Sequence, residues 1–224
     1  MPAPARIVLI HALRDSQVPT WTAFAKGWPE AEIHNLLDDS LSADLAAEGS
    51  LKRDMIERFL ALGRYAAGTA AQGHKTDAIL FTCSAFGPAI DAEKKDLSIP
   101  VLKPNEAAFE QALSCGHRIG LLVTFAPALP AMQAELEAMA KARDIALQFS
   151  GRVAEGALAA LQGGRPEEHD RLVAATAAEM PPLDALVLGQ FSLARAAQAI
   201  APVKGRPVFT TPEAAVAKLK ALVR

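Results

Sequence analysis

Cys83 is the side chain in this sequence best placed to do chemistry. It follows an apolar run over residues 78–82, which is typical of a buried parallel strand, and it precedes a Gly-Pro pair at which a helix is expected to begin. Backbone N–H groups after Cys83 can hold a carboxylate, and they are expected to lower the pKa of the thiol. The thiolate could then move a proton at the carbon beside that carboxylate. The plainer alternative is a small buried cysteine that ends a strand.

Short apolar runs alternate with Ala-rich helical patterns along the whole chain, which predicts parallel sheets with right-handed crossovers. Ligands of such sheets bind beyond the carboxyl ends of the strands, so the loops that follow the strands are the place to look for a site. The expected strands are residues 7–10, 32–37, 78–82, 101–102, 119–124, 146–149, 185–188 and 208–209, and the expected helices include residues 50–72, 127–143, 153–161 and 212–223.

A faint internal repeat predicts two related lobes. Three of its four paired segments have the same spacing along the chain and fall at the same point of a strand–helix cycle. We expect an α/β fold of two pseudo-symmetric lobes, residues 1–112 and 113–224, each a parallel sheet flanked by helices. The last helix, 212–224, could pack on the first lobe, and the site is expected in the cleft between the lobes. The paired segments are Arg6-Ile7 and Arg118-Ile119, Asp77-Ala78 and Asp184-Ala185, Pro100-Val101 and Pro207-Val208, and Glu106-Ala107-Ala108 and Glu213-Ala214-Ala215.

Composition excludes several classes of protein. Of the 224 residues, 51% are hydrophobic and 21% charged, which suits a folded globular chain. The formal net charge of −2 provides no basic surplus for nucleic acid or anionic membranes, and 5% aromatic residues do not suit a base-stacking platform. No signal peptide or membrane span is expected, and the two cysteines fit a reduced, cytoplasmic protein.

The strand plan, the two-lobe repeat and the Thr82-Cys83-Ser84 turn resemble the aspartate/glutamate racemase superfamily, which includes the hydantoin racemases, arylmalonate decarboxylase and maleate isomerase. The resemblance covers essentially the whole chain. It implies an enzyme that needs no pyridoxal or other cofactor, acts on a small carboxylate such as an amino acid, and leaves room for a homo-oligomer. Two-base members of the family use one cysteine from each lobe, and the first of these falls on Cys83.

The position equivalent to the second family cysteine is Gln190, which follows Asp184 by the same number of residues as Cys83 follows Asp77. A glutamine amide cannot act as a base near neutral pH. Three alternatives follow for the chemistry. His11 or an ordered water could supply the second proton, Cys83 could work alone as a one-sided proton donor, or Cys83 could attack as a nucleophile with Gln190 as a polar clamp.

Other loop residues could bind the substrate. Ser84 and Ala85 offer N–H groups to a carboxylate, and Thr124 offers a hydroxyl. The mirrored loop contributes Gln190 with Phe191 and Ser192. Ordinary loop capping is the alternative role for all of them. Two Asp-Ser pairs, Asp15-Ser16 and Asp39-Ser40, could orient an amine or a hydroxyl, although turns and helix caps use the same residue types.

Three functions therefore stand beside each other: racemisation, decarboxylation of a substituted malonate-like diacid, and binding of a carboxylate without catalysis. Cys115 and His117 lie close in sequence, but no second pair follows at ligand spacing, so no metal site is expected. The glycine-rich nucleotide motifs, the zinc-protease helix motif and the nucleophile-elbow motif do not occur in the sequence.

Overall fold

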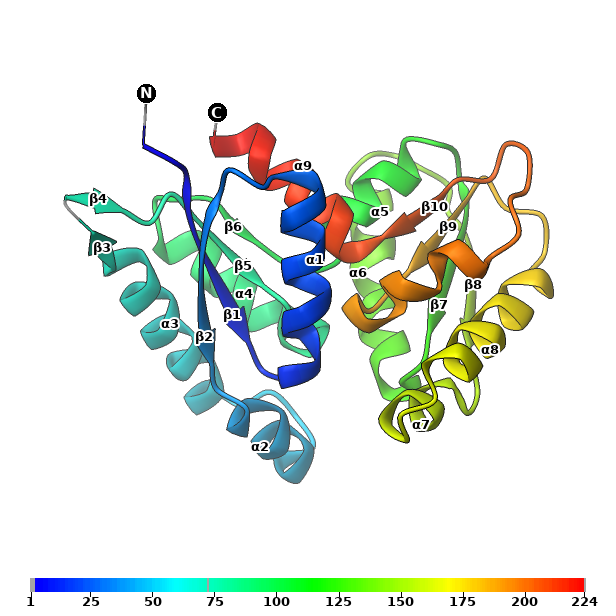
Figure 1. Ribbon diagram of the computed structural model, residues 1–224, viewed down its shortest axis with the longest axis horizontal. Helices are drawn as coiled ribbons and strands as arrows, with labels where there is room; N and C mark the ends of the chain where they lie inside the picture. The colour runs from blue at the N-terminus through cyan, green and yellow to red at the C-terminus, as the bar shows by residue number, and fades with distance from the viewer. Residues whose placement is uncertain (1–2, 72, 224) are drawn as a thin grey trace. The chain divides into compact units, whose positions relative to one another are not determined.

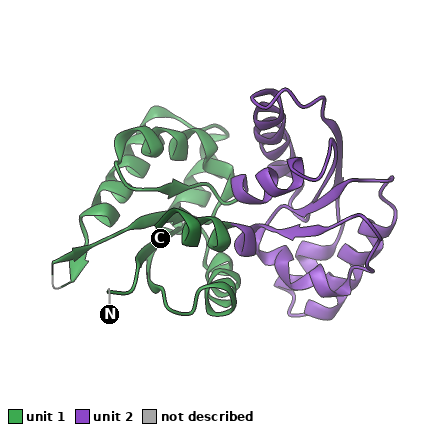
Figure 2. Cartoon of the chain, turned by 90° about the horizontal axis from the view of Figure 1, so that it is seen from above, with its two compact units in different colours: residues 1–104, 215–224 green, residues 105–214 purple. Residues whose placement is uncertain are grey.

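The computed structural model of the protein describes residues 3–71 and 73–223. The chain forms two compact units, coloured separately in Figure 2. The first comprises residues 1–104 and 215–224, and the second comprises residues 105–214.

The first unit is built on a four-stranded parallel sheet in the order β2-β1-β5-β6 (Figure 1). The central strands β1 and β5 are buried along their whole length, which explains their near-continuous apolar sequences. The four strands are β1 (Arg6–His11), β2 (Glu32–Leu37), β5 (Ala78–Phe81) and β6 (Val101–Leu102).

Helices α3 (Arg53–Gly68) and α4 (Gly87–Asp96) pack on one face of this sheet. The rings of Phe59, Phe81 and Phe86 stack at the centre of that layer. The unit also contains α1 (Gln17–Gly27), α2 (Ser40–Glu48), the short helices η1 (Arg14–Ser16) and η2 (Ser84–Phe86), and a two-stranded ribbon of β3 (Ala70–Ala71) and β4 (His74–Lys75).

The second unit repeats the plan with a parallel sheet in the order β10-β9-β7-β8. Its strands are β7 (Arg118–Val123), β8 (Gln148–Val153), β9 (Ala185–Leu188) and β10 (Val208–Thr210). One face is covered by α5 (Glu106–Leu113) and α6 (Leu129–Lys141), which follows the short helix η3 (Ala126–Ala128). The other face is covered by α7 (Ala157–Gln162), α8 (Pro166–Ala178) and the 3-10 helix η4 (Phe191–Ala199).

The two sheets thus share one strand order, with β8, β7, β9 and β10 in the places of β2, β1, β5 and β6. This agrees with the fold class predicted from the repeat.

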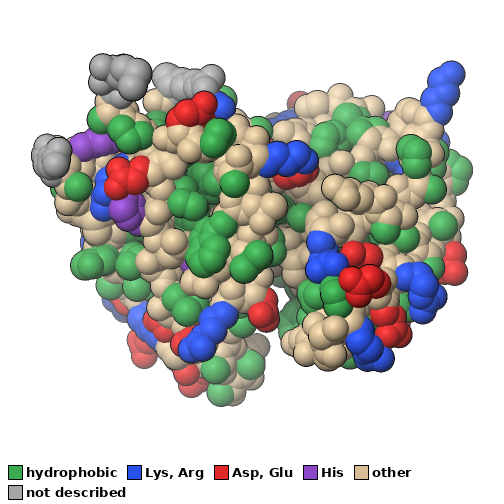
Figure 3. Space-filling view, viewed as in Figure 1, with side chains coloured by type: hydrophobic (Ala, Val, Ile, Leu, Met, Phe, Trp, Pro, Cys, Tyr) green, Lys and Arg blue, Asp and Glu red, His purple; other side chains and the backbone are tan. Residues whose placement is uncertain are grey.

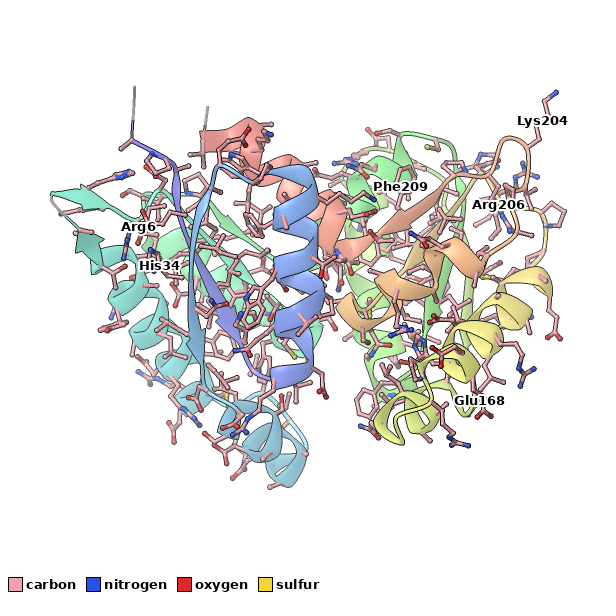
Figure 4. The ribbon with its side chains drawn as sticks, in the orientation of Figure 1. Arg6, His34, Glu168, Lys204, Arg206 and Phe209 are labelled. Atoms are coloured by element: carbon pink, nitrogen blue, oxygen red, sulfur yellow. The ribbon has the colours of Figure 1, made fainter. Side chains whose placement is uncertain are left out.

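Figure 4 shows Arg6 on β1 beside His34 on β2, where both pair with Glu32 at distances of 2.9 and 2.7 Å. On the face shown in Figure 3, acidic and basic side chains intermingle and do not form a patch of one sign.

The observed boundary between the units differs from the sequence expectation. The structure divides the units before α5, because α5 packs on β9 and β10 of the second sheet; the expected division was at residue 112. Most of the last helix, α9 (Thr211–Val223), groups with the first unit, the arrangement that the sequence expectation allowed, and its Lys220 Nζ donates a hydrogen bond of 3.0 Å to the Gly27 carbonyl of α1.

The predicted helix over residues 153–161 was wrong at its start. Val153 is the last residue of β8, since it pairs with Val123 of β7, and the helix α7 begins only at Ala157. The edge strand β8 is polar and half-buried, which hid its length in the sequence. No helix within the described residues is long and apolar enough to span a membrane.

Candidate functional site

Cys83 lies directly after β5, at the carboxyl edge of the first sheet, and caps the amino end of η2 with an extended backbone. The residue is half-buried, and its sulfur lies against two donors, the backbone N–H of Ala85 and the hydroxyl of Ser42. The Ser42 hydroxyl also reaches the Ala12 carbonyl at 3.0 Å, so its proton can turn from that carbonyl toward the sulfur. The local geometry therefore offers a thiolate two hydrogen bonds.

Burial nevertheless raises the pKa of the Cys83 thiol above its ordinary value, and the hydrogen bonds from Ala85 and Ser42 lower it by less. This corrects the sequence expectation of a lowered pKa. Desolvation of the charged form outweighs the two donors because the thiol lies against the apolar core layer of the first unit. At neutral pH the resting group is the protonated thiol.

His11 ends β1 beside this site, but its ring is completely buried. Its Nδ1 lies 2.8 Å from the Thr82 hydroxyl and 3.0 Å from the Ser16 hydroxyl, and its Nε2 lies 3.0 Å from Asn35 Oδ1. Both ring nitrogens are therefore engaged within the protein. The ring holds Thr82, the residue before Cys83, and Ser16 in place.

The network also fixes the tautomer of His11. Asn35 Oδ1 accepts a hydrogen bond of 2.8 Å from Trp21 Nε1, which identifies that atom as the oxygen, so His11 Nε2 must carry a proton to donate to it. Burial lowers the pKa of His11 despite the opposing effect of the Asn35 hydrogen bond. Neutral His11 then accepts a hydrogen bond at Nδ1 from a hydroxyl, and it does not present an acid to a ligand.

The two Asp-Ser pairs predicted to orient a substrate have different surroundings in the structure. Asp15 is exposed, whereas Ser16 is buried and donates a hydrogen bond of 2.7 Å to the Leu13 carbonyl. Asp39 forms an ion pair of 2.8 Å with Arg14, and both side chains are exposed. Of these, only Ser16 belongs to the hydrogen-bonded network behind Cys83.

A neighbouring ion-pair cluster follows β2 at the same sheet edge. Arg58 of α3 donates to Asp38 at 2.6 Å, to Asp44 at 2.5 Å and to the Ser40 hydroxyl. Burial is the largest single effect on the pKa of Asp38 and acts to raise it, but the hydrogen bonds from Ser40 and Arg58 and the charge of Arg58 together keep that pKa below its ordinary value. The cluster anchors α2, which carries Ser42.

In the second unit, Gln190 follows β9 at the position equivalent to Cys83. Its side-chain oxygen accepts three hydrogen bonds: from the Thr124 backbone N–H at 2.7 Å, the Thr124 hydroxyl at 2.9 Å and the Phe125 backbone N–H at 3.3 Å. Thr124 was expected to donate its hydroxyl to a substrate. In the structure that hydroxyl proton is already given to Gln190, within the same unit.

The residues after Gln190 form η4. Phe191 is buried, with 4% of its surface exposed, and Ser192 is half-buried. Arg195 of η4 binds Asp170 of α8 through both carboxylate oxygens, at 2.9 and 3.1 Å, and Asp170 also bonds His169 Nδ1 at 2.8 Å. The buried ring of Phe191 is therefore not available to a ligand.

Sequence reasoning found Cys83 and His11 but missed one partner of each. Ser42, which lies against Cys83, comes from α2, and Asn35, which binds His11, comes from the edge strand β2; neither carries a motif that would single it out. Cys115 is exposed in the turn after α5, and its thiol donates a weak bond of 3.4 Å to the Gln111 carbonyl of that helix. Within residues 3–71 and 73–223, no group of three or more His, Cys, Asp or Glu side chains could hold a metal ion.

Comparison with known proteins gives a consistent result. The sequence model described as Asp/Glu/Hydantoin racemase matches residues 53–219. No curated protein sequence matches the chain.

Solved structures share the fold at low sequence identity. An aspartate racemase homologue from Pyrococcus horikoshii has a TM-score of 0.68 at 16% identity, over 97% of this chain and 98% of that one. A glutamate racemase isoform from Bacillus anthracis has a TM-score of 0.67 at 12% identity, over 99% and 82%. An allantoin racemase from Pseudomonas fluorescens has a TM-score of 0.66 at 19% identity, over 98% and 91%.

Proposed function

Because the chain belongs to the Asp/Glu/hydantoin racemase family, we propose that it is an isomerase that moves a proton at the carbon beside a carboxylate, with no cofactor and with Cys83 as the transferring group. The observation that carries the proposal is the position of Cys83. It follows a buried central strand at the carboxyl edge of a parallel sheet, with the Ala85 N–H and the Ser42 hydroxyl against its sulfur.

The chemistry follows from the state of the thiol. A buried thiol with a raised pKa is protonated at rest, and it is a strong base once it has lost its proton. It can therefore give its proton to a carbanion-like centre, or take one from a carbon acid whose charge is spread onto the carboxylate. The Ala85 and Ser42 donors stabilise the thiolate during that exchange, and His11, Ser16 and Thr82 hold the end of the strand behind it.

Decarboxylation is the second candidate function, and Gln190 favours it. An amide at the position equivalent to the second family cysteine supplies no base, so protonation from the Cys83 side alone would suffice for a lyase that releases carbon dioxide from a malonate-like diacid. A protein that binds a carboxylate without catalysis is the third candidate. We place the racemase first, because the matched sequence model describes racemases.

Deuterium exchange distinguishes the three. The protein is incubated in deuterated water with the two enantiomers of aspartate, glutamate, hydantoins and allantoin, and with substituted malonates. Deuterium at the alpha carbon without loss of carbon dioxide supports the isomerase. Release of carbon dioxide with one enantiomer labelled supports the lyase. If neither reaction occurs but a ligand still raises the melting temperature, the binding protein is correct.

Cysteine variants test the assignment of the catalytic group. Cys83→Ala is expected to abolish exchange with no change in circular dichroism, because no other thiol lies at this sheet edge in the described residues. Cys115→Ala is the matched control, and it should retain full activity since the Cys115 sulfur is exposed and its hydrogen bond goes to the Gln111 carbonyl of α5. Turnover that survives in Cys83→Ala would refute the proposal.

The Gln190→Cys variant tests whether the missing second cysteine limits activity. The family resemblance implies two thiols, and Gln190 stands at the position of the second. The substitution places a thiol where the amide stands, and we expect exchange or racemisation to rise relative to the unchanged protein. A variant that folds normally, still binds the ligand and shows no gain argues for the one-sided lyase or for the binding protein.

A further inference from the structure

The carboxamide of Gln190 is held in one orientation. Its Oε1 atom accepts from the Thr124 N–H, the Thr124 hydroxyl and the Phe125 N–H, so three donors converge on a single oxygen. Rotating the amide by half a turn would bring its own two N–H bonds against the two backbone N–H groups, donor against donor. The three contacts therefore select the orientation in which Oε1 points inward.

Fixing the oxygen also fixes the amino group. Within the described residues the Nε2 group of Gln190 has no hydrogen-bond partner. It is also not among the buried polar atoms without a partner, so this amino group is at least partly exposed. The side chain is half-buried, and its two free N–H bonds point away from the Thr124 and Phe125 donors toward solvent. At the carboxyl edge of the second sheet, the chain thus presents hydrogen-bond donors at position 190.

We propose that Gln190 is a binding residue whose fixed amino group donates a hydrogen bond to an acceptor oxygen of the ligand. The role of the Thr124–Phe125 turn is to orient that amino group. The inference rests on the proposed function in one respect, since it takes the ligand to be a carboxylate. An amide so oriented binds an acceptor and does not bind a donor, so position 190 selects ligands that place a carboxylate or carbonyl oxygen there.

Gln190→Glu is the sharpest variant, because glutamate has nearly the same shape. One carboxylate oxygen would take the place of Oε1, where three donors favour it, and the other would replace the amino group with an acceptor. The turn is preserved while the group offered to the ligand is inverted. Gln162→Glu, at the exposed end of α7, adds the same charge in the same unit and serves as the control.

The first measurement needs no ligand. In protein labelled with nitrogen-15 in glutamine side chains, the Gln190 amide signals are identified by their loss in Gln190→Glu. They should relax like the rigid backbone, whereas those of exposed Gln162 relax as a mobile side chain. Thr124→Val should loosen the Gln190 amide and Thr124→Ser should not. A Gln190 amide as mobile as that of Gln162 overturns the fixed orientation.

The second measurement adds sodium malonate as the carboxylate probe. Malonate should shift the Gln190 amide signals, and its affinity should fall at least about tenfold in Gln190→Glu but not in Gln162→Glu. If malonate binds, as shown by shifts of the Ala85 or Ser42 amides, and the Gln190 signals do not move, the inference fails and the proposed function stands. If neither malonate nor any amino acid of the panel binds, the carboxylate function itself fails, and the ligand contact proposed for Gln190 fails with it.

Discussion

Asp184 binds the start of β7 through Arg118: its carboxylate accepts the Arg118 backbone N–H at 2.8 Å and the Arg118 guanidinium at 3.0 and 2.5 Å. In the first unit, Asp77 accepts the Arg6 backbone N–H at 2.7 Å, the equivalent contact at the start of β1. The aspartate before each inner strand therefore ties that strand to its neighbour. This shared contact explains why the Asp77 and Asp184 repeat is visible in the sequence and why Cys83 and Gln190 are equivalent.

Asp184→Asn is expected to lower the melting temperature at neutral pH. The Arg118 side chain, followed by the Arg118 backbone, holds the pKa of Asp184 well below its ordinary value of 3.8. A carboxyl with a lowered pKa stabilises the folded state above that ordinary value, and the contribution is lost as the pH falls below it. The melting temperatures of protein and variant should therefore differ more at about pH 7 than at about pH 2, because the contribution declines as the pH falls from 3.8 toward the folded-state pKa. Glu155→Gln, an exposed carboxylate change in the same unit, should show no difference at either pH.

Glu93→Gln is expected to stabilise the protein at alkaline pH. The Glu93 side chain is completely buried between α4 and Gly63 of α3, where a side chain on Gly63 would overlap its carboxylate. Burial, with a smaller effect of nearby Asp96, raises the pKa of Glu93 to about 7 from 4.5. Because the folded state holds this proton more tightly than the unfolded state does, stability is lost as the pH rises from 4.5 to about 7.

The loss amounts to about 3 kcal/mol in the free energy of unfolding, at about 1.4 kcal/mol per pKa unit. Urea unfolding should show Glu93→Gln to be more stable than the unchanged protein at about pH 8 and similar at about pH 4. Glu179→Gln, on the exposed surface, is the control. A pH dependence that persists unchanged in Glu93→Gln would show that another group causes it.

Alkylation of Cys83 is expected to be slow at neutral pH and to accelerate in alkaline solution. Burial raises the pKa of this thiol, so its thiolate is scarce near neutrality. The measurement is the rate of iodoacetamide labelling against pH in Cys115→Ser, which removes the exposed thiol. Ser42→Ala should move the labelling curve to still higher pH, because it removes a hydroxyl that lowers the thiol pKa. Rapid labelling at neutral pH would contradict the prediction.

His11 is expected to remain neutral, with its proton on Nε2, at pH values below its ordinary pKa of 6.5. Burial is the larger cause of the lowered pKa, so the folded state binds this proton less tightly than the unfolded state. The stability that results is complete above 6.5 and is lost as the pH falls. Nitrogen-15 chemical shifts of the imidazole report both the charge and the tautomer. A protonated Nδ1 at neutral pH would contradict the Asn35–Trp21 arrangement.

The parallel sheets were predictable because their central strands are buried on both faces and therefore have apolar sequences, such as those of β5 and β9. The polar edge strand β8 and the start of α7 were not, because β8 mixes half-buried residues such as Ser150 with exposed ones such as Arg152 and shows no clear periodicity. The network around His11 was also hidden from the sequence. Its members Ser16, Asn35 and Thr82 come from three elements and meet only through the pairing of β1 with β2 and β5.

The sequence by itself determined the two-fold plan, the place of Cys83 at a strand end and the presence of an amide at the equivalent position 190. These features are local, or they repeat along the chain, so the sequence pattern alone predicts them. Only the tertiary structure decided the state of those groups. Burial raises the pKa of Cys83, and three donors brought together by the pairing of β7 with β9 orient Gln190. Both effects depend on which atoms surround a group in space, and those neighbours cannot be read from the sequence.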